Sequence, residues 1–134
     1  MKNVQRVFTD DAPAPLGHYS QAVRSAGLIH VSAQLPIKGG EYPSESDRQP
    51  FADQARLVLS NVLRVLHAAG AQPIDVLKVT AYIVGVENWG VFDTAFAEAF
   101  GDARPARSVV PVPHLHHGYL VALDAVALDV ETTS

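Results

Sequence analysis

Two charged side chains stand in otherwise apolar, strand-like segments, and both could take part in chemistry. Arg107 begins the segment 107–112, where a loop enters the predicted sheet, and its planar guanidinium suits a carboxylate of the protein or of a ligand. Asp124 has apolar neighbours throughout residues 119–128, so it requires a partner, a hydrogen bond or a raised pKa. For each residue two interpretations stay open: a structural pair, which for Asp124 could cross a subunit boundary, and a role in a site.

Histidines gather in the segment PHLHHGY. His114 and His116 are two residues apart, so on a strand they would face the same side and could bind one metal ion. No third ligand is marked by spacing, and this favours a polar loop between two strands over a metal site.

Composition and missing motifs exclude several classes of protein. With no cysteine, the chain has no disulfide, no thiolate nucleophile and no cysteine-based zinc or iron–sulfur site. It also lacks the signatures of dinucleotide-binding, P-loop, zinc-protease and serine-hydrolase proteins. The net charge of −4 argues against a nucleic-acid partner. No apolar stretch approaches the roughly 18 residues of a membrane span, so we expect no membrane partner and a cytoplasmic location.

The elements that position these residues begin with a hairpin. The first dozen or so residues are rich in Asp, Ala and Pro and are expected to be loose. A turn signal at residues 25–27 then predicts that residues 19–23 pair with residues 28–32. Polar positions on this hairpin are Tyr19, Ser32 and Gln34.

A helix follows, bounded by Pro50 at its start and Gly70 just past its end. Its apolar stripe, at three- and four-residue spacing, is Phe51, Ala55, Val58, Leu59, Val62, Leu66 and Ala69. Polar residues interleave with this stripe: Asp53, Gln54, Arg56, Ser60, Asn61 and Arg64.

The rest of the chain predicts a strand, a second helix and two further strands. The strand in residues 75–85 turns alternate apolar residues inward, namely Leu77, Val79, Ala81 and Ile83. A helix is expected over residues 89–100, stopped by Gly101. Residues 106–112 and 119–130 are the last strands, and the final one is apolar on both faces, which is typical of a strand covered on both sides.

This order predicts a single α/β domain over residues 1–134, in which two helices cover one face of a mixed sheet. Charged residues make up 18% of the chain, below the roughly 25% that is usual for soluble domains. We therefore expect another subunit to cover part of the apolar surface.

Several segments carry a resemblance to a known family. They are APAPLGHYSQ from Ala12, VSAQLP from Val31, the helix ending in AAG with Asp75 following, and RPARSVVPV from Arg104. Through nearly its whole length the chain resembles the reactive intermediate deaminase family, also called the RidA or YjgF family. The PARS block, followed by an apolar strand with a central acid, is the most specific part.

The resemblance implies a chorismate-mutase-like domain that forms a homotrimer, with ligand pockets in the clefts between subunits. It implies hydrolysis of enamine and imine intermediates, such as 2-aminoacrylate, to 2-keto acids and ammonia, without a cofactor or metal. The substrate would be a small carboxylate. In such a trimer the apolar last strand would lie in the interior, where the deficit of surface charge would also belong.

The resemblance also assigns roles to residues of this chain. Arg107 matches the arginine that holds the substrate carboxylate with two parallel hydrogen bonds. Tyr19 matches the aromatic residue that packs over the ligand. Ser32 and the backbone of Ala33 match the lining of the pocket, although most members have Gly in place of Ala33. The backbone at Val109 corresponds to the carbonyl that helps to hold the attacking water.

Other positions depart from the family pattern. The glutamate thought to position the water aligns with Ala122, which cannot relay a proton. Asp124 lies on the same strand face, about 6.6 Å further along, so it would need a different substrate pose to replace that glutamate. Asp93 stands where members often have Asn and would repel an anionic substrate if it faced the pocket. His114 and His116 are candidates for the missing proton relay.

Two functions are compatible with these residues. The first is a trimeric imine deaminase, and the second is a trimer that binds small keto or amino acids without converting them. Arg107 supports both, whereas Ala122 favours the second or a changed mechanism. The ribonuclease activity attributed to some relatives is disfavoured by the net charge of −4.

Overall fold

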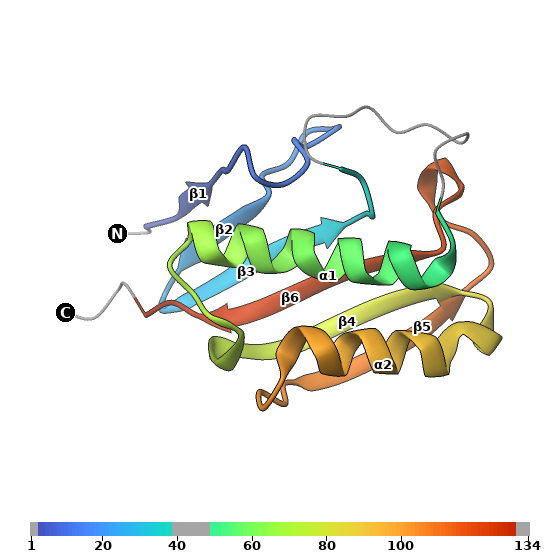
Figure 1. Ribbon diagram of the computed structural model, residues 1–134. Helices are drawn as coiled ribbons and strands as arrows, with labels where there is room; N and C mark the ends of the chain where they lie inside the picture. The colour runs from blue at the N-terminus through green and yellow to red at the C-terminus, as the bar shows by residue number, and fades with distance from the viewer. Residues whose placement is uncertain (1–2, 39–48, 131–134) are drawn as a thin grey trace.

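One mixed sheet organises the chain. The computed structural model describes residues 3–38 and 49–130 (Figure 1). Its strands are β1 (Gln5–Val7), β2 (Ala22–Ser25), β3 (Leu28–Gln34), β4 (Val76–Val84), β5 (Ala106–Val112) and β6 (Val121–Leu128), in the order β1-β2-β3-β6-β4-β5. Strands β4 and β5 are parallel, whereas the other neighbouring pairs are antiparallel. The predicted mixed sheet is confirmed.

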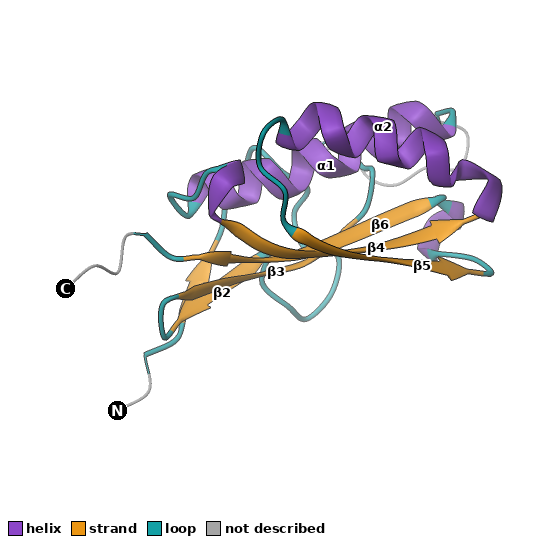
Figure 2. Ribbon diagram, turned by 90° about the horizontal axis from the view of Figure 1, so that it is seen from below, coloured by secondary structure: helices purple, strands orange, loops and turns teal. Residues whose placement is uncertain are grey.

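Two helices, α1 (Phe51–Ala68) and α2 (Trp89–Phe100), pack side by side on one face of this sheet (Figure 2). Short 3-10 turns occur at η2 (Pro73–Asp75), η3 (Val86–Asn88) and η4 (His116–Gly118). Neither α1 nor α2 covers the second face of the sheet. The expected placement of both helices on one face is confirmed, and it leaves a helix-covered face and an open face.

Helix α1 has the boundaries that its sequence predicts. Pro50 is the residue before its first turn, and Gly70 follows it with φ of 89°, a left-handed conformation that glycine adopts without strain. Two of the interleaved polar residues, Gln54 and Asn61, are buried. The Asn61 amide donates to the carbonyls of Leu35 and Ile37, each at 2.9 Å. Gln54 Oε1 accepts a hydrogen bond from the backbone N–H of Leu120 at 2.9 Å.

The N-terminal half differs from the sequence prediction in two places. Strand β2 begins at Ala22 rather than at Tyr19, and β3 extends to Gln34. The two strands are joined by a turn whose residues Ala26 and Gly27 both have positive φ, as hairpin turns require. The expected loose N-terminus is wrong, because β1 pairs with β2 as an edge strand. With three residues, of which only Val7 is buried, β1 is too short to show alternation.

Strands β4 and β6 correct two further expectations. Leu77 is 43% exposed, and Val76 takes the inward position instead. A register shift against β6 between Val76 and Lys78 reverses the alternation at this point, as a β-bulge does. Strand β6 is shorter than residues 119–130, since it runs from Val121 to Leu128. No helix in residues 3–38 and 49–130 is long and apolar enough to cross a membrane.

Candidate functional site

Arg107 lies on β5, at the edge of the sheet and on its helix-covered face. It is in register with the buried Val79, and its guanidinium carbon lies 4.9 Å from the ring centre of Phe96 and 5.9 Å from that of Phe92, both on α2. Its Nη1 donates to Asp93 Oδ1 at 2.8 Å. The side chain of Arg107 is 25% exposed and that of Asp93 is 63% exposed. The arginine therefore holds a carboxylate of its own chain at the surface.

Val109 lies two residues further along β5, on the same face as Arg107. Its side chain packs against the hydrophobic core. Because β5 pairs with β4 and with no other strand in residues 3–38 and 49–130, its outer edge is available to another molecule. Arg107, Asp93 and Val109 thus form one group at this edge of the sheet.

Tyr19, Ser32 and Ala33 form a second group. Ser32 Oγ donates to the carbonyl of Ser20 at 2.7 Å, and its backbone N–H donates to the carbonyl of Gln21 at 2.9 Å. These bonds hold the loop that carries Tyr19 beside β3. Tyr19 and Ala33 both line a small cavity of about 40 Å³. The structure therefore brings together Tyr19, which the resemblance places over the ligand, and Ser32 and Ala33, which it assigns to the pocket lining.

The two groups lie far apart within one chain. Ser32 is on β3 and Arg107 is on β5, and β6 and β4 lie between these strands. At about 4.8 Å for each strand spacing, the separation is roughly 14 Å. No ligand of the size of a small amino acid spans that distance, so a single subunit does not contain the whole predicted site.

Asp124 lies on the open face of the sheet, opposite to that of Arg107. Its register partner is Thr80, and Tyr82 Oη donates to Asp124 Oδ2 at 3.2 Å. Burial raises the pKa of the Asp124 carboxyl, while the Tyr82 hydrogen bond and the charge of Lys78 lower it. Burial also raises the pKa of Tyr82, and the neighbouring Asp124 adds to that shift. The expectation that Asp124 has a partner is confirmed within the chain itself.

Sequence reasoning missed Tyr82 as the partner of Asp124. Tyr82 is the register partner of Ala122, so it lies on the open face beside the position where the family has its glutamate. Period-two alternation places Tyr82 on the face opposite to Ile83, which is a usable signal. Its contact with Asp124 depends on the pairing of β4 with β6, which no local pattern specifies.

His116 lies in η4, beyond the far end of β5 from Arg107. From Arg107 to Val112 the strand alone covers roughly 17 Å, so the two side chains are separated within one chain. The ring of His116 lies close to that of His117, with centroids 3.8 Å apart and planes tilted by 46°, and His114 is exposed. Residues 3–38 and 49–130 hold no group of three His, Cys, Asp or Glu side chains that could bind a metal ion.

A cavity of about 410 Å³ lies between α1 and α2 and is lined by Arg56, Arg64 and His67 among others. None of the predicted site residues lines it. The candidate site residues therefore lie outside this groove between the helices.

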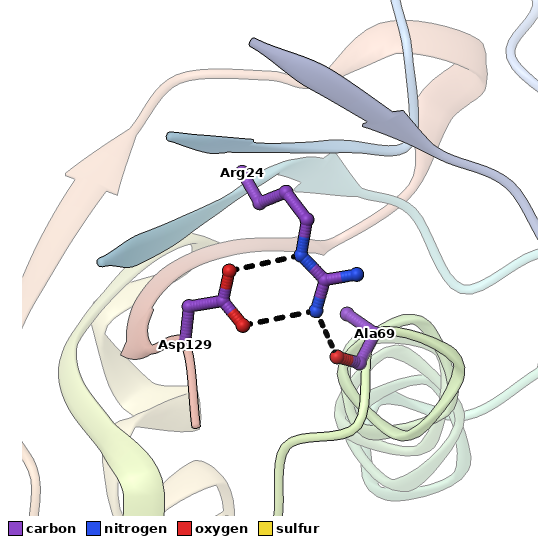
Figure 3. A network of polar contacts seen from close by, with 3 residues as sticks. All are labelled: Arg24, Ala69 and Asp129. Atoms are coloured by element: carbon purple, nitrogen blue, oxygen red, sulfur yellow. Dashed lines mark hydrogen bonds and ion pairs between the residues drawn. The ribbon is translucent and has the colours of Figure 1, made fainter. Parts of the chain in front are cut away.

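A second arginine–carboxylate pair, absent from the sequence-based predictions, connects three segments (Figure 3). Arg24 on β2 donates through Nε to Asp129 Oδ2 at 2.9 Å and through Nη2 to Asp129 Oδ1 at 3.0 Å. The same Nη2 also donates to the carbonyl of Ala69 at the end of α1. The Asp129 side chain is fully buried. These contacts stabilise the fold and lie apart from both groups of candidate site residues.

Comparison with known proteins agrees with the fold. The model of the family described as Endoribonuclease L-PSP matches residues 9–129. A RutC family protein of Pyrococcus horikoshii is 37% identical over 129 residues, which cover 95% of this chain and 98% of that protein. A 2-iminobutanoate/2-iminopropanoate deaminase of Escherichia coli is 31% identical over 127 residues, covering 91% of this chain and 95% of that protein. The crystal structure of Escherichia coli TdcF with bound serine has a TM-score of 0.83 at 29% identity, covering 92% of this chain and 98% of that one.

The chain belongs to this L-PSP family, which is also the YjgF/RidA family. The resemblance seen in its PARS and GHYSQ segments is thereby confirmed. The α/β fold, with two helices on one face of a mixed sheet, matches that of solved members. Imine deaminase is the name of relatives within this family.

Proposed function

We propose that the protein hydrolyses reactive 2-imino acids and their enamine forms, such as 2-aminoacrylate, to 2-keto acids and ammonia. The observation that carries the proposal is the Arg107 guanidinium, which is held against Phe96 at an open sheet edge and already binds one carboxylate. The deaminase name of the Escherichia coli relative and the serine bound to TdcF support a small amino-acid-like substrate.

The complete site requires a second subunit in this proposal. Arg107 and Val109 occupy one edge of the sheet, and Tyr19, Ser32 and Ala33 lie on the far side of β6 and β4. A head-to-tail contact would bring the first group of one copy to the second group of the next, and such contacts close into rings. The family resemblance makes that ring a homotrimer.

Arg107 binds the substrate carboxylate, Tyr19 packs over the substrate, and the backbone at Val109 holds a water molecule. The water oxygen bonds to the imine carbon and gives up one proton to become a hydroxyl, while the π electrons of C=N move to nitrogen, which takes up a proton. After a second protonation the C–N bond breaks, ammonia leaves, and the hydroxyl proton is lost as C=O forms. The imine carbon is already electrophilic, so orientation and proton transfer are the main requirements.

Asp124 is our first candidate for the proton transfer, and His116 is the second. Because the pKa of Asp124 is raised, its carboxyl stays protonated to a higher pH than an ordinary aspartate. Tyr82 Oη can donate a hydrogen bond to the carboxylate after the proton is lost. Because Asp124 lies on the opposite face from Arg107, it would act on a substrate held by the Arg107 of another subunit.

A binding protein that does not convert its ligand is the alternative, and two observations favour it. Ala122 cannot accept a proton at the position of the family glutamate, and Asp93 occupies one donor of Arg107. Such a protein would retain affinity for small keto or amino acids but would not accelerate hydrolysis.

The deciding experiment measures ammonia and keto-acid release from imino acids formed in situ by an amino-acid oxidase. Wild type should accelerate release, and the acceleration by Arg107→Ala should be about a hundred-fold smaller. Arg56→Ala removes an exposed arginine from α1 and should behave as wild type. Keto-acid binding without acceleration on any imino acid of a panel would overturn the deaminase in favour of the binding protein.

Mixing two inactive variants tests whether the site is shared. Arg107→Ala and Tyr19→Ala damage opposite halves of the proposed cleft. If the halves meet between subunits, an equal mixture should be unfolded and refolded together. About a quarter of all clefts should then have both halves intact, because subunits combine at random around a ring. No recovery in mixed oligomers, or a monomer at micromolar concentration, would contradict the shared site.

A further inference from the structure

Helix α2 carries three phenylalanine rings in a row. Phe92, Phe96 and Phe100 are spaced by four residues, so their side chains follow one face of the helix, and all three are buried. The ring centres of Phe92 and Phe96 are 5.8 Å apart, and those of Phe96 and Phe100 are 4.5 Å apart. Phe96 is therefore the middle ring, and a neighbouring ring packs against it on each side.

The guanidinium of Arg107 lies over this row of rings. Its carbon is 4.9 Å from the ring centre of Phe96 and 5.9 Å from that of Phe92. A cation over an aromatic face within about 6 Å is attracted by the ring, and more strongly where water is partly excluded. The Arg107 side chain is only 25% exposed. Phe96, as the nearer ring, should contribute the larger part of this attraction.

Helix α2 thus holds the guanidinium at two points. Asp93 and Phe96 are three residues apart, so they share one side of the helix. Asp93 Oδ1 accepts the bond from Nη1 at 2.8 Å, and the ring of Phe96 supports the group. A long arginine side chain without such support would lose its rotamer freedom only when a ligand binds, which weakens binding. Here that freedom is already restricted in the folded chain.

From this arrangement we infer that Phe96 is a positioning residue of the carboxylate site, which raises the affinity for a ligand carboxylate by fixing the Arg107 guanidinium. The inference rests on the proposed function, because it uses Arg107 as the carboxylate-binding residue. The deaminase and the binding protein share this carboxylate site, so the inference applies to both. Phe96 acts on the ligand through Arg107 alone.

The expected effect is modest and measurable. Ordering one flexible side chain on binding weakens an affinity by roughly two- to ten-fold. Loss of the Phe96 ring should therefore weaken carboxylate binding by about five-fold. The effect should depend on the arginine, because the ammonium group of a lysine has no planar fork of donors to orient. In an Arg107→Lys background, loss of the ring should weaken binding by less than about two-fold.

Calorimetric binding of 2-oxobutanoate tests this inference. Phe96→Leu and Phe96→Met stay apolar but lack the ring, and both should bind about five-fold more weakly than wild type. Phe96→Tyr keeps the ring and should bind as wild type does. Phe100→Leu is the matched control, because it makes the same change in the same row of buried rings, one helical turn beyond the ring nearest to Arg107. It should lower stability in denaturant unfolding about as much as Phe96→Leu, yet leave the affinity unchanged.

The outcomes separate this inference from the proposed function. If Phe100→Leu weakens binding as much as Phe96→Leu, or if Phe96→Leu has its full effect beside Arg107→Lys, the ring acts through the general packing of α2 and the inference is overturned. Binding as in wild type by Phe96→Leu and Phe96→Met, or weak binding by Phe96→Tyr, overturns it too, while the carboxylate site stands. If Arg107→Ala binds 2-oxobutanoate as wild type does, the carboxylate site itself is wrong.

Discussion

Arg24 and Arg107 each hold an aspartate, but the two pairs differ in almost every physical respect. Arg24 donates to both oxygens of Asp129 and to a backbone carbonyl, and its side chain is 14% exposed while that of Asp129 is fully buried. Arg107 makes a single bond to an aspartate that is 63% exposed. The first arginine uses its donors inside the protein, and the second keeps most of them for another molecule.

The surroundings of the two arginines explain this difference. Arg24 on β2 bonds to a residue beyond the end of β6 and to the end of α1, so this contact connects three separate parts of the chain (Figure 3). Arg107 lies at the sheet edge and is oriented by aromatic rings, which accept no strong hydrogen bond. A mostly buried arginine that bonds both oxygens of a buried carboxylate stabilises a fold, whereas an oriented arginine with a single bond at an edge is suited to bind a ligand.

The largest effect should follow from breaking the buried pair. Asp129→Asn leaves the Arg24 charge buried without its counter-charge, and we expect a loss of about 3–5 kcal/mol in the free energy of unfolding. Denaturant unfolding at a fixed protomer concentration measures this loss. Arg24→Ala should cost at least as much, because it leaves the fully buried Asp129 carboxylate without its counter-charge. A change below about 1 kcal/mol for Asp129→Asn would show that the pair is not structural.

Replacing each arginine by lysine should separate binding from stability. Lysine keeps the charge but loses the planar fork, so Arg107→Lys should weaken binding of 2-oxobutanoate by about ten-fold and leave unfolding nearly unchanged. Arg24→Lys should do the reverse, lowering stability without changing that affinity. Calorimetry gives the affinity of each variant for 2-oxobutanoate, and denaturant unfolding gives the stability of each variant. Equal effects of the two substitutions on binding would remove the distinction between the pairs.

A smaller, pH-dependent effect is expected at Asp124, which belongs to neither pair. Its pKa is raised in the folded chain, so the folded state retains a proton that the unfolded state releases. Stability should therefore fall as pH rises from the ordinary carboxyl pKa through the raised one. Asp124→Asn removes this decline, and Tyr82→Phe should deepen it, because the Tyr82 hydrogen bond lowers the pKa. Unfolding curves from about pH 3 to about pH 7 that run parallel for all three proteins would contradict the assignment.

The smallest effect should be that of Asp93 on stability. An exposed ion pair contributes up to about 1 kcal/mol and is screened by salt, so Asp93→Asn should change the free energy of unfolding by less than that. The difference should vanish near 1 M salt, where the screening length is about 3 Å. A loss as large as that of Asp129→Asn would make the Arg107 pair structural after all.

Local patterns in the sequence were sufficient for much of the fold. The spacing of apolar residues, with Pro50 and Gly70 at the boundaries, predicts α1 within a residue or two, and α2 has the predicted bounds 89–100. These elements depend on contacts between neighbours in the chain, which periodicity records. Strand β1 and the inward position of Val76 were missed, because a short edge strand and a β-bulge are defined by pairing with distant segments.

For the candidate site, the sequence by itself determined which chemical groups are present, and the tertiary structure decided where they lie. The PARS segment and the lone acid of the last strand identified Arg107 and Asp124 as candidates. Strand pairing then placed them on opposite faces and joined Asp124 to Tyr82, and the packing of α2 on the sheet brought Asp93 to Arg107. Side-chain type is local information, whereas register and packing depend on residues far apart in the chain, and no single segment contains them.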